Sequence, residues 1–254
     1  MSLPLARKLG KQAPFHDPRT LQLANYLKVG ALPPTPPVWK NYAEKVTNWP
    51  MFSNDTLGDC TCAGAGHMIM EWTANAGDPY VPTDAEIVAA YSAITGYTPS
   101  NPNSDQGAVE TDVLKYWQST GIAGHKIGAF VALQPGDQNH IKDAIALFTG
   151  CYIGVSLPLT AQGQTTWSVP PGGAVGQGAP GSWGGHAINI IGFNPRELVF
   201  ISWGAVYRMT WEFWAIYCDE AYAIISPDLF NGKNAAPDGL DLAQLTIDLA
   251  LVKN

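Results

Sequence analysis

The sequence predicts an α+β protein in which a helical first half packs against a sheet-forming second half. Between residues 60 and 150, apolar residues recur at helical spacing. After residue 150, short runs of β-branched and aromatic residues are bounded by Gly and Pro, as is typical of strands. Hydrophobic residues make up 46% of the 254 residues, which is enough for a substantial core. We therefore expect one compact unit built from two halves.

Residues 1–50 are expected to form an extended arm. The segment ALPPTPPVW (Ala31–Trp39) is Pro-rich and indicates an extended conformation. Such an arm suits either a brace along the surface or an occupant of a cleft. The first residues, MSLPLARKLGKQAPFHDPR, contain no apolar core typical of a signal peptide. No run approaches the ~18 apolar residues of a membrane span. We therefore expect a cytoplasmic protein that does not enter a membrane.

Residues 51–150 are expected to form the helical half. The first helix runs from Cys60 to about Ala76, and its small residues at 63–66 indicate close packing. A second helix begins at Thr83, because Glu86 three residues later completes a capping-box pattern. Apolar residues at helical spacing predict further helices within 108–121 and 139–150, each ending at a glycine.

Residues 151–254 are expected to form the β-rich half, with strands at 151–157, 186–193 and 198–203. The Gly/Pro-rich loop at 159–185 is longer than structural loops usually are, which favours a functional or mobile role. The aromatic segment 210–225 fits either a helix or a strand, and its Asp219 and Glu220 could face a cleft. A C-terminal helix is predicted within 239–252.

Charge and cysteine content argue against several functions. The net charge is −7 and Lys/Arg never cluster, so we expect no nucleic-acid partner. Four cysteines in a chain of this length do not make a disulfide scaffold, and reduced thiols are the expected state. For Cys151 and Cys218, a disulfide and two buried thiols both remain open.

Cys60 and Cys62 form a CxC pair that fits neither a metal site nor a disulfide. Residues i and i+2 of a helix point to different sides, and no second Cys/His pair follows at zinc spacing. His67 lies roughly 10 Å from Cys60 along the helix axis at ~1.5 Å per residue. We therefore expect no metal and no cofactor, and we assign Cys62 and His67 to packing.

A nucleophilic role suits Cys60 better. A cysteine in the first turn of a helix lies at the positive end of the helix dipole, which favours the thiolate. Such a nucleophile needs a base that can be distant in sequence. His186 is the better candidate than His67, because it opens a predicted strand after a double glycine in WGGHAINIIGFN.

The ordered segments NDTLGDCT, IKDAIALFTGCYIGVSLP, GGHAINIIGFN and LVFISWG resemble the papain-like cysteine peptidase superfamily. They are most similar to its divergent bacterial members, with their LGSCT and GGHAVxxxGY forms. The resemblance spans roughly residues 50–226. It implies a papain-like fold, with a cleft between the helical half and an antiparallel β-sheet or barrel half.

The resemblance also implies the roles of individual residues. Cys60 takes the position of the nucleophile and His186 that of its general-base partner. The family's oxyanion-hole Gln lies six residues before the nucleophile, where this chain has Asn54. Asn carries the same NH2 donor on a shorter stem, and one such donor is worth several kcal/mol. The backbone N–H of Cys60 would be the second donor.

Two positions depart from the family pattern. The family's imidazole-orienting Asn is replaced by Ile201, and strand alternation is expected to turn the adjacent Ser202 away from His186. Asn189 or Asp59 remains as a candidate to orient the His186 imidazole in place of that Asn. Asp59 also replaces a small residue before the nucleophile, and a nearby carboxylate raises a thiol pKa. Trp203 is expected either to pack in the core or to take the place of the Trp that shields the His–Asn hydrogen bond in the family.

We therefore expect a thiol-dependent acyl hydrolase of the peptidase or amidase type, acting through a dyad of Cys60 and His186. Its partner would be a peptide or amide substrate. The alternatives are a catalytically inactive papain-fold module that binds a protein partner in the cleft, and an acyltransferase on the same scaffold. The sequence leaves the substrate and the oligomeric state open.

Overall fold

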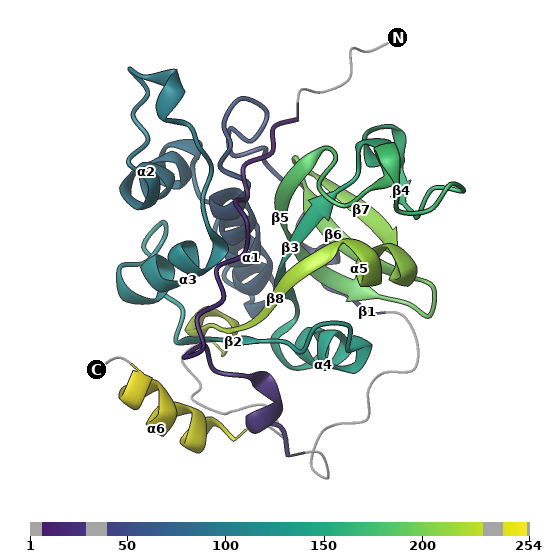
Figure 1. The fold of residues 1–254 in the computed structure, drawn as a ribbon. Helices are drawn as coiled ribbons and strands as arrows, with labels where there is room; N and C mark the ends of the chain where they lie inside the picture. The colour runs from purple at the N-terminus through teal and green to yellow at the C-terminus, as the bar shows by residue number, and fades with distance from the viewer. Residues whose placement is uncertain (1–6, 29–39, 231–240, 253–254) are drawn as a thin grey trace.

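A computed structural model describes residues 7–28, 40–230 and 241–252 of the chain (Figure 1). The Pro-rich segment 31–39 lies outside the described residues. The α-helices of the described part are α1 (Cys60–Ala76), α2 (Asp84–Thr95), α3 (Glu110–Ser119), α4 (Gln138–Phe148), α5 (Trp211–Tyr217) and α6 (Leu242–Val252). The strands are β1 (Lys40–Asn41), β2 (Ala129–Ala132), β3 (Cys151–Leu157), β4 (Thr166–Trp167), β5 (Gly184–Phe193), β6 (Glu197–Ser202), β7 (Ala205–Thr210) and β8 (Cys218–Ile225).

One mixed sheet organises the fold. Its strands follow the order β2-β8-β3-β5-β6-β7-β4, and β1 pairs separately with β5. The pairings are antiparallel except for the short β4–β7 pair. Helices and an antiparallel sheet occupy separate parts of the molecule, so the predicted α+β class is confirmed.

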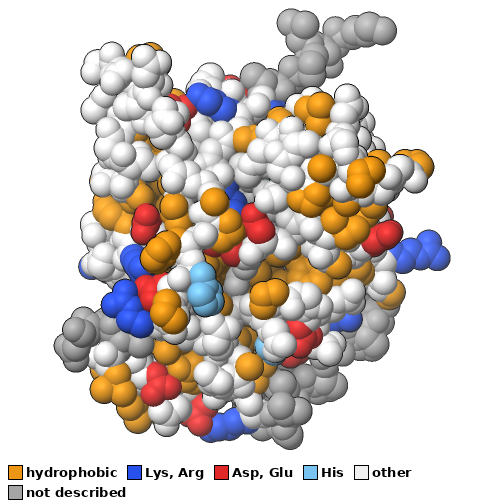
Figure 2. All heavy atoms as spheres, viewed as in Figure 1, with side chains coloured by type: hydrophobic (Ala, Val, Ile, Leu, Met, Phe, Trp, Pro, Cys, Tyr) orange, Lys and Arg blue, Asp and Glu red, His pale blue; other side chains and the backbone are white. Residues whose placement is uncertain are grey.

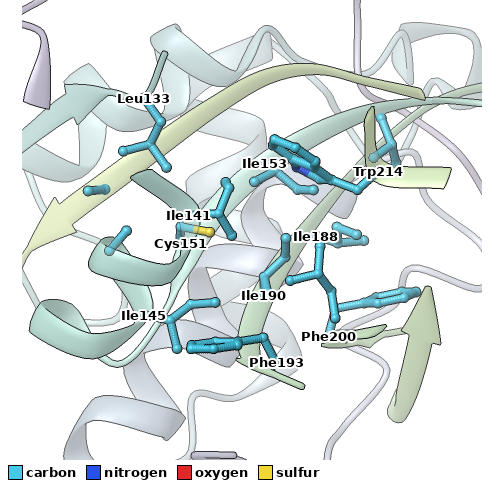
Figure 3. Close-up of a cluster of buried hydrophobic side chains, with 14 of the residues drawn as sticks. Leu133, Ile141, Ile145, Cys151, Ile153, Ile188, Ile190, Phe193, Phe200 and Trp214 are labelled. Atoms are coloured by element: carbon cyan, nitrogen blue, oxygen red, sulfur yellow. The ribbon is translucent and has the colours of Figure 1, made fainter. Parts of the chain in front are cut away.

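The sheet is covered on both faces. Helix α1 packs on one face, with α2 and α3 on the far side of α1 from the strands (Figure 1). Helix α4 covers the opposite face, where its side chains pack against β3 and β5 (Figure 3). In that cluster Ile141 and Ile145 of α4 lie over Ile153, Ile188 and Ile190 of the sheet. This packing fixes β5, the strand that carries His186, between two apolar layers.

Helix α1 has the predicted bounds, and its small residues allow the expected close packing. A Cβ added at Gly64 would lie 3.0 Å from the Tyr152 ring. A Cβ at Gly66 would lie 2.8 Å from both Ile87 and Phe52. Any larger side chain at these positions would push α1 away from its neighbours, and with it the residue at its N-terminus.

Other elements follow the sequence pattern to different degrees. The capping box at Thr83 and Glu86 is present at the start of α2. The ambiguous segment 210–225 contains both structures, because α5 ends at Tyr217 and β8 follows at once. Strands β1, β2, β4 and β7 were not predicted; two of them are only two residues long.

The loop 159–185 is packed against the body. It contains two short 3-10 turns and strand β4, whose Trp167 is completely buried. The Tyr217 hydroxyl donates a hydrogen bond to the Gly178 carbonyl at 2.6 Å. The Trp167 indole and the Gly178 carbonyl therefore tie two points of the loop to the core.

The C-terminal helix α6 packs against the N-terminal region. Leu245 is completely buried, and the Tyr26 hydroxyl donates to Asp248 at 2.8 Å. Within the described ranges, none of the helices combines the length and apolar character needed to cross a bilayer.

Candidate active site

Cys60 is the first residue of α1 and lies against the start of β5. Cys60 is 1% exposed, and the backbone N–H groups of Ala187 and Gly10 lie close enough to its thiol to lower the thiol pKa. Burial raises the pKa of this thiol to about 12; the two N–H contacts lower it and Asp59 raises it further, but burial dominates. The helix N-terminus alone does not ionise Cys60 in this closed arrangement.

His186, near the start of β5, has a firmly held ring. Its Nε2 lies 2.7 Å from the Ser202 hydroxyl oxygen. Its imidazole stacks on the indole of Trp203, with ring centroids 4.2 Å apart and planes 14° apart. His186 Nδ1 has no hydrogen-bond partner among the residues that the structure describes. One face and one nitrogen of the imidazole are therefore fixed, and the other nitrogen remains available.

Ser202 therefore lies on the same side as His186, and the expectation that it points away is wrong. Side chains alternate along β5 and β6. Phe200, two residues from Ser202, belongs to the cluster under α4, and so does Ile188, two residues from His186. Ile201 belongs to the cluster on the α1 face. The residue that replaces the family's Asn thus lies on the opposite face, and the neighbouring hydroxyl contacts the imidazole instead.

Asn189 does not contact His186. It lies three residues along β5, so alternation places it on the α1 face with Ala187 and Ile191. Its side-chain amide is completely buried and has no hydrogen-bond partner in the described part of the chain. The arrangement leaves Ser202, not Asn189, as the neighbour of the imidazole.

Asn54 and Asp59 lie together beside the start of α1. Asn54 Nδ2 donates to the Leu57 carbonyl at 3.0 Å. Burial raises the pKa of Asp59 well above its ordinary value, against a smaller lowering by the Asn54 side chain. Asp59 is fully buried and does not cap α1 with its side chain. Asp59 in turn raises the pKa of the neighbouring Cys60 thiol, as a carboxylate next to a thiolate does.

Both members of the candidate dyad are uncharged in this structure. Burial, with smaller contributions from Arg7 and His67, lowers the pKa of His186 to about 3. Since the pKa of Cys60 lies far above that of His186, proton transfer from the thiol to the imidazole is unfavourable here. The physical cause on both sides is exclusion of water.

A segment of the N-terminal arm excludes that water. We call residues 7–12 the N-terminal strap. Lys8 N donates to the Asn54 carbonyl at 3.0 Å, and the Trp203 indole donates to the Lys8 carbonyl at 3.1 Å. The Arg7 guanidinium lies 5.2 Å from the centre of the Trp203 ring. The strap thus covers the Asn54, Cys60 and Trp203 region, and it runs between the helices and the sheet (Figure 1).

The strap is bound on both sides by main-chain hydrogen bonds. Ala108, just before α3, donates to the Gly10 carbonyl at 2.8 Å and accepts from Gln12 N at 2.9 Å. On the sheet side, Lys11 N donates to the Gly185 carbonyl at 3.2 Å. The strap therefore pairs with the helical half and with β5 at once.

Glycines make this close approach possible. A Cβ at Gly10 would collide with the Gly58 carbonyl, and one at Gly185 would collide with the Lys11 carbonyl. A Cβ at Gly184 would lie 2.9 Å from the Leu9 side chain. The double glycine before His186 thus makes room for a peptide, and in this structure that peptide is the strap.

The remaining cysteines and His67 have packing roles. All four cysteines are free thiols, and Cys62 and Cys151 are completely buried. His67 Nε2 lies 2.8 Å from the Pro50 carbonyl, and the ring packs against Trp49 and Phe52. Among the described residues, no group of three or more His, Cys, Asp or Glu side chains forms a candidate metal site.

The structure places Ser202 and Trp203 against the His186 imidazole, and it places Cys60 beside Ala187, the next residue of β5. The sequence offered residues 1–50 as a brace or as an occupant of a cleft, but it did not single out the strap. The strap is short and polar, and its role follows from pairing with Ala108 and Gly185, distant in sequence. The glycines at 10, 58 and 107, all close to one another in the fold, were the available signal.

The chain has a papain-like fold, in which a helix that begins at a buried cysteine packs on an antiparallel sheet that carries a histidine. No family sequence model matches the chain, and no curated protein matches it in sequence. The likeness is to solved structures.

Xylellain, a cysteine protease from Xylella fastidiosa, superposes with a TM-score of 0.67 at 14% identity, covering 89% of this chain and 98% of that one. The procathepsin B S9 of Trypanosoma congolense gives 0.60 at 12% identity, covering 87% of each chain. The bromelain protease of Ananas comosus, solved with the E64 inhibitor, gives 0.54 at 12% identity, covering 75% of this chain and all of that one. At such identities the likeness establishes the fold alone.

Proposed function

We propose that the protein is a thiol-dependent acyl hydrolase of the peptidase type, and that the structure is its closed form. The observation that carries the proposal is the contact of the Cys60 thiol with the backbone just after His186, whose imidazole is held by Ser202 and Trp203. The papain-like fold supports it. The likeness to xylellain supports assignment to the bacterial-type members of that superfamily.

The chemistry would begin after the strap leaves. His186 would take the thiol proton, and the Cys60 sulfur would attack the carbonyl carbon of a peptide or amide. The Cys60 backbone N–H and the Asn54 amide would hold the resulting oxyanion. His186 would then protonate the departing amine, leaving a thioester on Cys60. Water, deprotonated by His186, would hydrolyse that thioester and restore the free thiol.

Ser202 and Trp203 would act on the orientation of His186. The hydroxyl contacts Nε2 and the indole covers one face of the ring, so Nδ1 is the nitrogen free to accept the thiol proton. A serine would thus perform the orienting role for which the family uses an asparagine.

The rival proposal is an inactive module on the same fold. The neutral Cys60 and His186 and the apolar Ile201 favour it. The two proposals differ in what happens when the strap is displaced: an enzyme gains a reactive thiol, whereas an inactive module gains only an exposed one. An acyltransferase would also gain a reactive thiol, but would pass the acyl group to an added amine faster than to water.

The test uses the full chain and its Gly10→Val variant, in which the new side chain collides with the Gly58 carbonyl and displaces the strap. We expect Gly10→Val to hydrolyse fluorogenic peptide amides. We also expect iodoacetamide at pH 7 to alkylate its Cys60 about tenfold faster than an unfolded thiol. The readouts are product fluorescence and mass spectrometry of the Cys60 peptide.

Gly163→Val is the matched control, because a Cβ at Gly163 meets no atom within 4 Å and should leave the strap in place. Cys60→Ala in the Gly10→Val background should abolish hydrolysis. If Gly10→Val remains folded with an accessible Cys60 that reacts no faster than an unfolded thiol and cleaves no peptide, the protein is the inactive module.

A further inference from the structure

The Lys11 side chain of the strap fills a pocket lined by acidic residues. The side chain is 1% exposed, although lysine is rarely buried in full. Its Nζ lies 2.9 Å from Asp219 Oδ1 and 3.0 Å from Glu220 Oε1, and it donates to the Gln12 carbonyl at 3.2 Å. The ammonium thus has partners for its three N–H bonds. Glu110 at the start of α3 is a third acidic neighbour of Lys11.

Surrounding residues hold the pocket in shape. Tyr222 donates to Glu220 Oε2 at 2.9 Å, and Ser156 donates to Asp219 Oδ2 at 2.8 Å. Beneath the lysine stem lies Gly154 of β3, where an added Cβ would collide with Lys11 Cε. Gly154 leaves room for the lysine stem, and two hydroxyl groups hold the carboxylates of Glu220 and Asp219 in place. The pocket is therefore shaped for a linear side chain that ends in an ammonium.

Glu110 is a buried carboxyl group beside Lys11 with unused hydrogen-bonding capacity. It is completely buried, and neither of its carboxylate oxygens has a hydrogen-bond partner in the described part of the chain. Burial and the neighbouring Glu220 raise the pKa of Glu110, while Lys11 opposes them. Burial lowers the pKa of Lys11, but Glu110, Glu220 and Asp219 outweigh it and the net pKa is raised. The cluster therefore favours a cation.

The pocket lies next to the candidate catalytic residues. The N–H of Gly10, adjacent to Lys11 in the strap, lies close enough to the Cys60 thiol to lower its pKa. Lys11 itself pairs with Gly185, the residue before His186. A side chain that enters the pocket thus belongs to a peptide whose backbone crosses Cys60.

The pocket can be approached from outside. A hollow of about 210 Å³ is lined by Asp219, Glu220 and Tyr222 together with Phe15 and His16. Figure 2 shows this face, with acidic side chains near its middle, where the helical half meets the strands. The Asp219 side chain is 23% exposed, so it forms the outer rim of the acidic pocket.

We propose that the pocket formed by Glu110, Gly154, Asp219 and Glu220 recognises the lysine side chain of a peptide substrate, and that Lys11 is its internal occupant. The cleavage of such a substrate rests on the proposed function. The recognition itself rests on the contacts of Lys11. A lysine-containing peptide competes with the strap for the same carboxylates, so the substrate and the strap exclude one another.

The substrate test uses the full-length Gly10→Val variant and peptide amides that differ only in carrying lysine, norleucine or glutamate at one position. We expect the lysine peptides to have a kcat/KM about tenfold above the norleucine peptides, because a buried carboxylate pair prefers a cation. Glu220→Gln in the same background should reduce that ratio by about tenfold. Hydrolysis without lysine preference would overturn the pocket proposal and leave the proposed function intact.

A second measurement does not depend on catalysis. Lys11→Ala removes the ammonium and leaves the pocket, and n-butylammonium should then raise the melting temperature of this variant more than n-butanol does. In the double variant Glu220→Gln and Lys11→Ala, n-butylammonium and n-butanol should shift the melting temperature equally. Lys11→Met, which keeps the length of the stem, serves if Lys11→Ala does not fold. Equal effects of the amine and the alcohol would overturn the proposal, whether or not the protein cleaves peptides.

Discussion

At the scale of single residues, the contact between Ser202 and His186 yields the first prediction. Ser202→Ala in the Gly10→Val background removes the partner of Nε2 and frees the ring to turn. We expect the alkylation rate of Cys60 at neutral pH to fall about tenfold, with its pH profile displaced, because a misoriented base is less effective. Ser202→Thr, which keeps the hydroxyl, should restore the profile.

The measurement is the alkylation rate of Cys60 between pH 5 and 9, followed by mass spectrometry. Circular dichroism of each variant checks that the fold is kept. An unchanged pH profile in Ser202→Ala would show that Trp203 alone orients His186 and that Ser202 has no positioning role.

Glu71 gives the second prediction, on pH-dependent stability. Burial raises the pKa of this carboxyl to about 8, from an ordinary value of 4.5. Between these values the folded chain keeps the proton and the unfolded chain releases it. The free energy of unfolding therefore falls as pH rises from 5 to 8, by about 1.4 kcal/mol for each unit of pKa difference.

Glu71→Gln should flatten this fall, because an amide has no proton to lose. Urea unfolding at pH 5 and pH 8 measures the difference. Glu44→Gln, on an exposed residue, is the control and should retain the wild-type dependence. A Glu71→Gln variant with the full wild-type fall would assign the pH dependence to other groups.

Sequence patterns could predict the candidate dyad because each residue begins a recognisable element. Cys60 follows a Gly-Asp pair at a helix start, and His186 follows two glycines at a strand start. The face on which Ser202 lies could not be predicted, because it depends on which side of β5 carries His186. The burial that leaves both residues neutral was equally hidden, since it comes from a strap 48 residues or more before Cys60.

At the scale of elements, the small residues of α1 yield the third prediction. Gly66→Val places methyl groups where a Cβ alone would already lie 2.8 Å from Ile87 and Phe52. We expect a loss of about 1–3 kcal/mol in the free energy of unfolding, because overpacking outweighs the gain in helix propensity. Urea unfolding measures it.

Gly163→Ala is the control for this change, because no atom lies within 4 Å of its added Cβ. Its stability should stay within about 0.5 kcal/mol of wild type. A Gly66→Val variant as stable as wild type would show that α1 can shift without cost.

The long helices and the three main strands follow from periodicity, but the short strands do not. Strands β1 and β4 have two residues each, too few to show alternation. Their existence depends on the neighbours β5 and β7 that accept them. Segment 210–225 was ambiguous because it is rich in aromatic residues throughout, and it divides into α5 and β8 at Cys218.

At the scale of the whole molecule, the strap yields the fourth prediction. The bond after Lys11 is a trypsin site, but the Lys11 side chain is buried and its backbone is paired with Gly185. We expect limited trypsin digestion to leave this bond intact in the wild-type protein and to cut it within minutes in Gly10→Val.

Mass spectrometry of the N-terminal fragments distinguishes the two outcomes. Lys28, whose side chain is 57% exposed, provides an internal control that should be cut at similar rates in both proteins. Equal cleavage after Lys11 in both proteins would show that the strap is not held in solution as the structure has it.

The contact between Gly10 and Cys60 has a kinetic consequence. The strap presents the Gly10 amide N–H to the sulfur, while the Gly10 carbonyl accepts a hydrogen bond from Ala108, so we expect the thiol not to cut its own strap. If the strap is removed by cleavage, the cut must be made by a second molecule that is already open. Maturation of a purified sample should then begin with a lag, accelerate autocatalytically, and become faster in proportion to protein concentration.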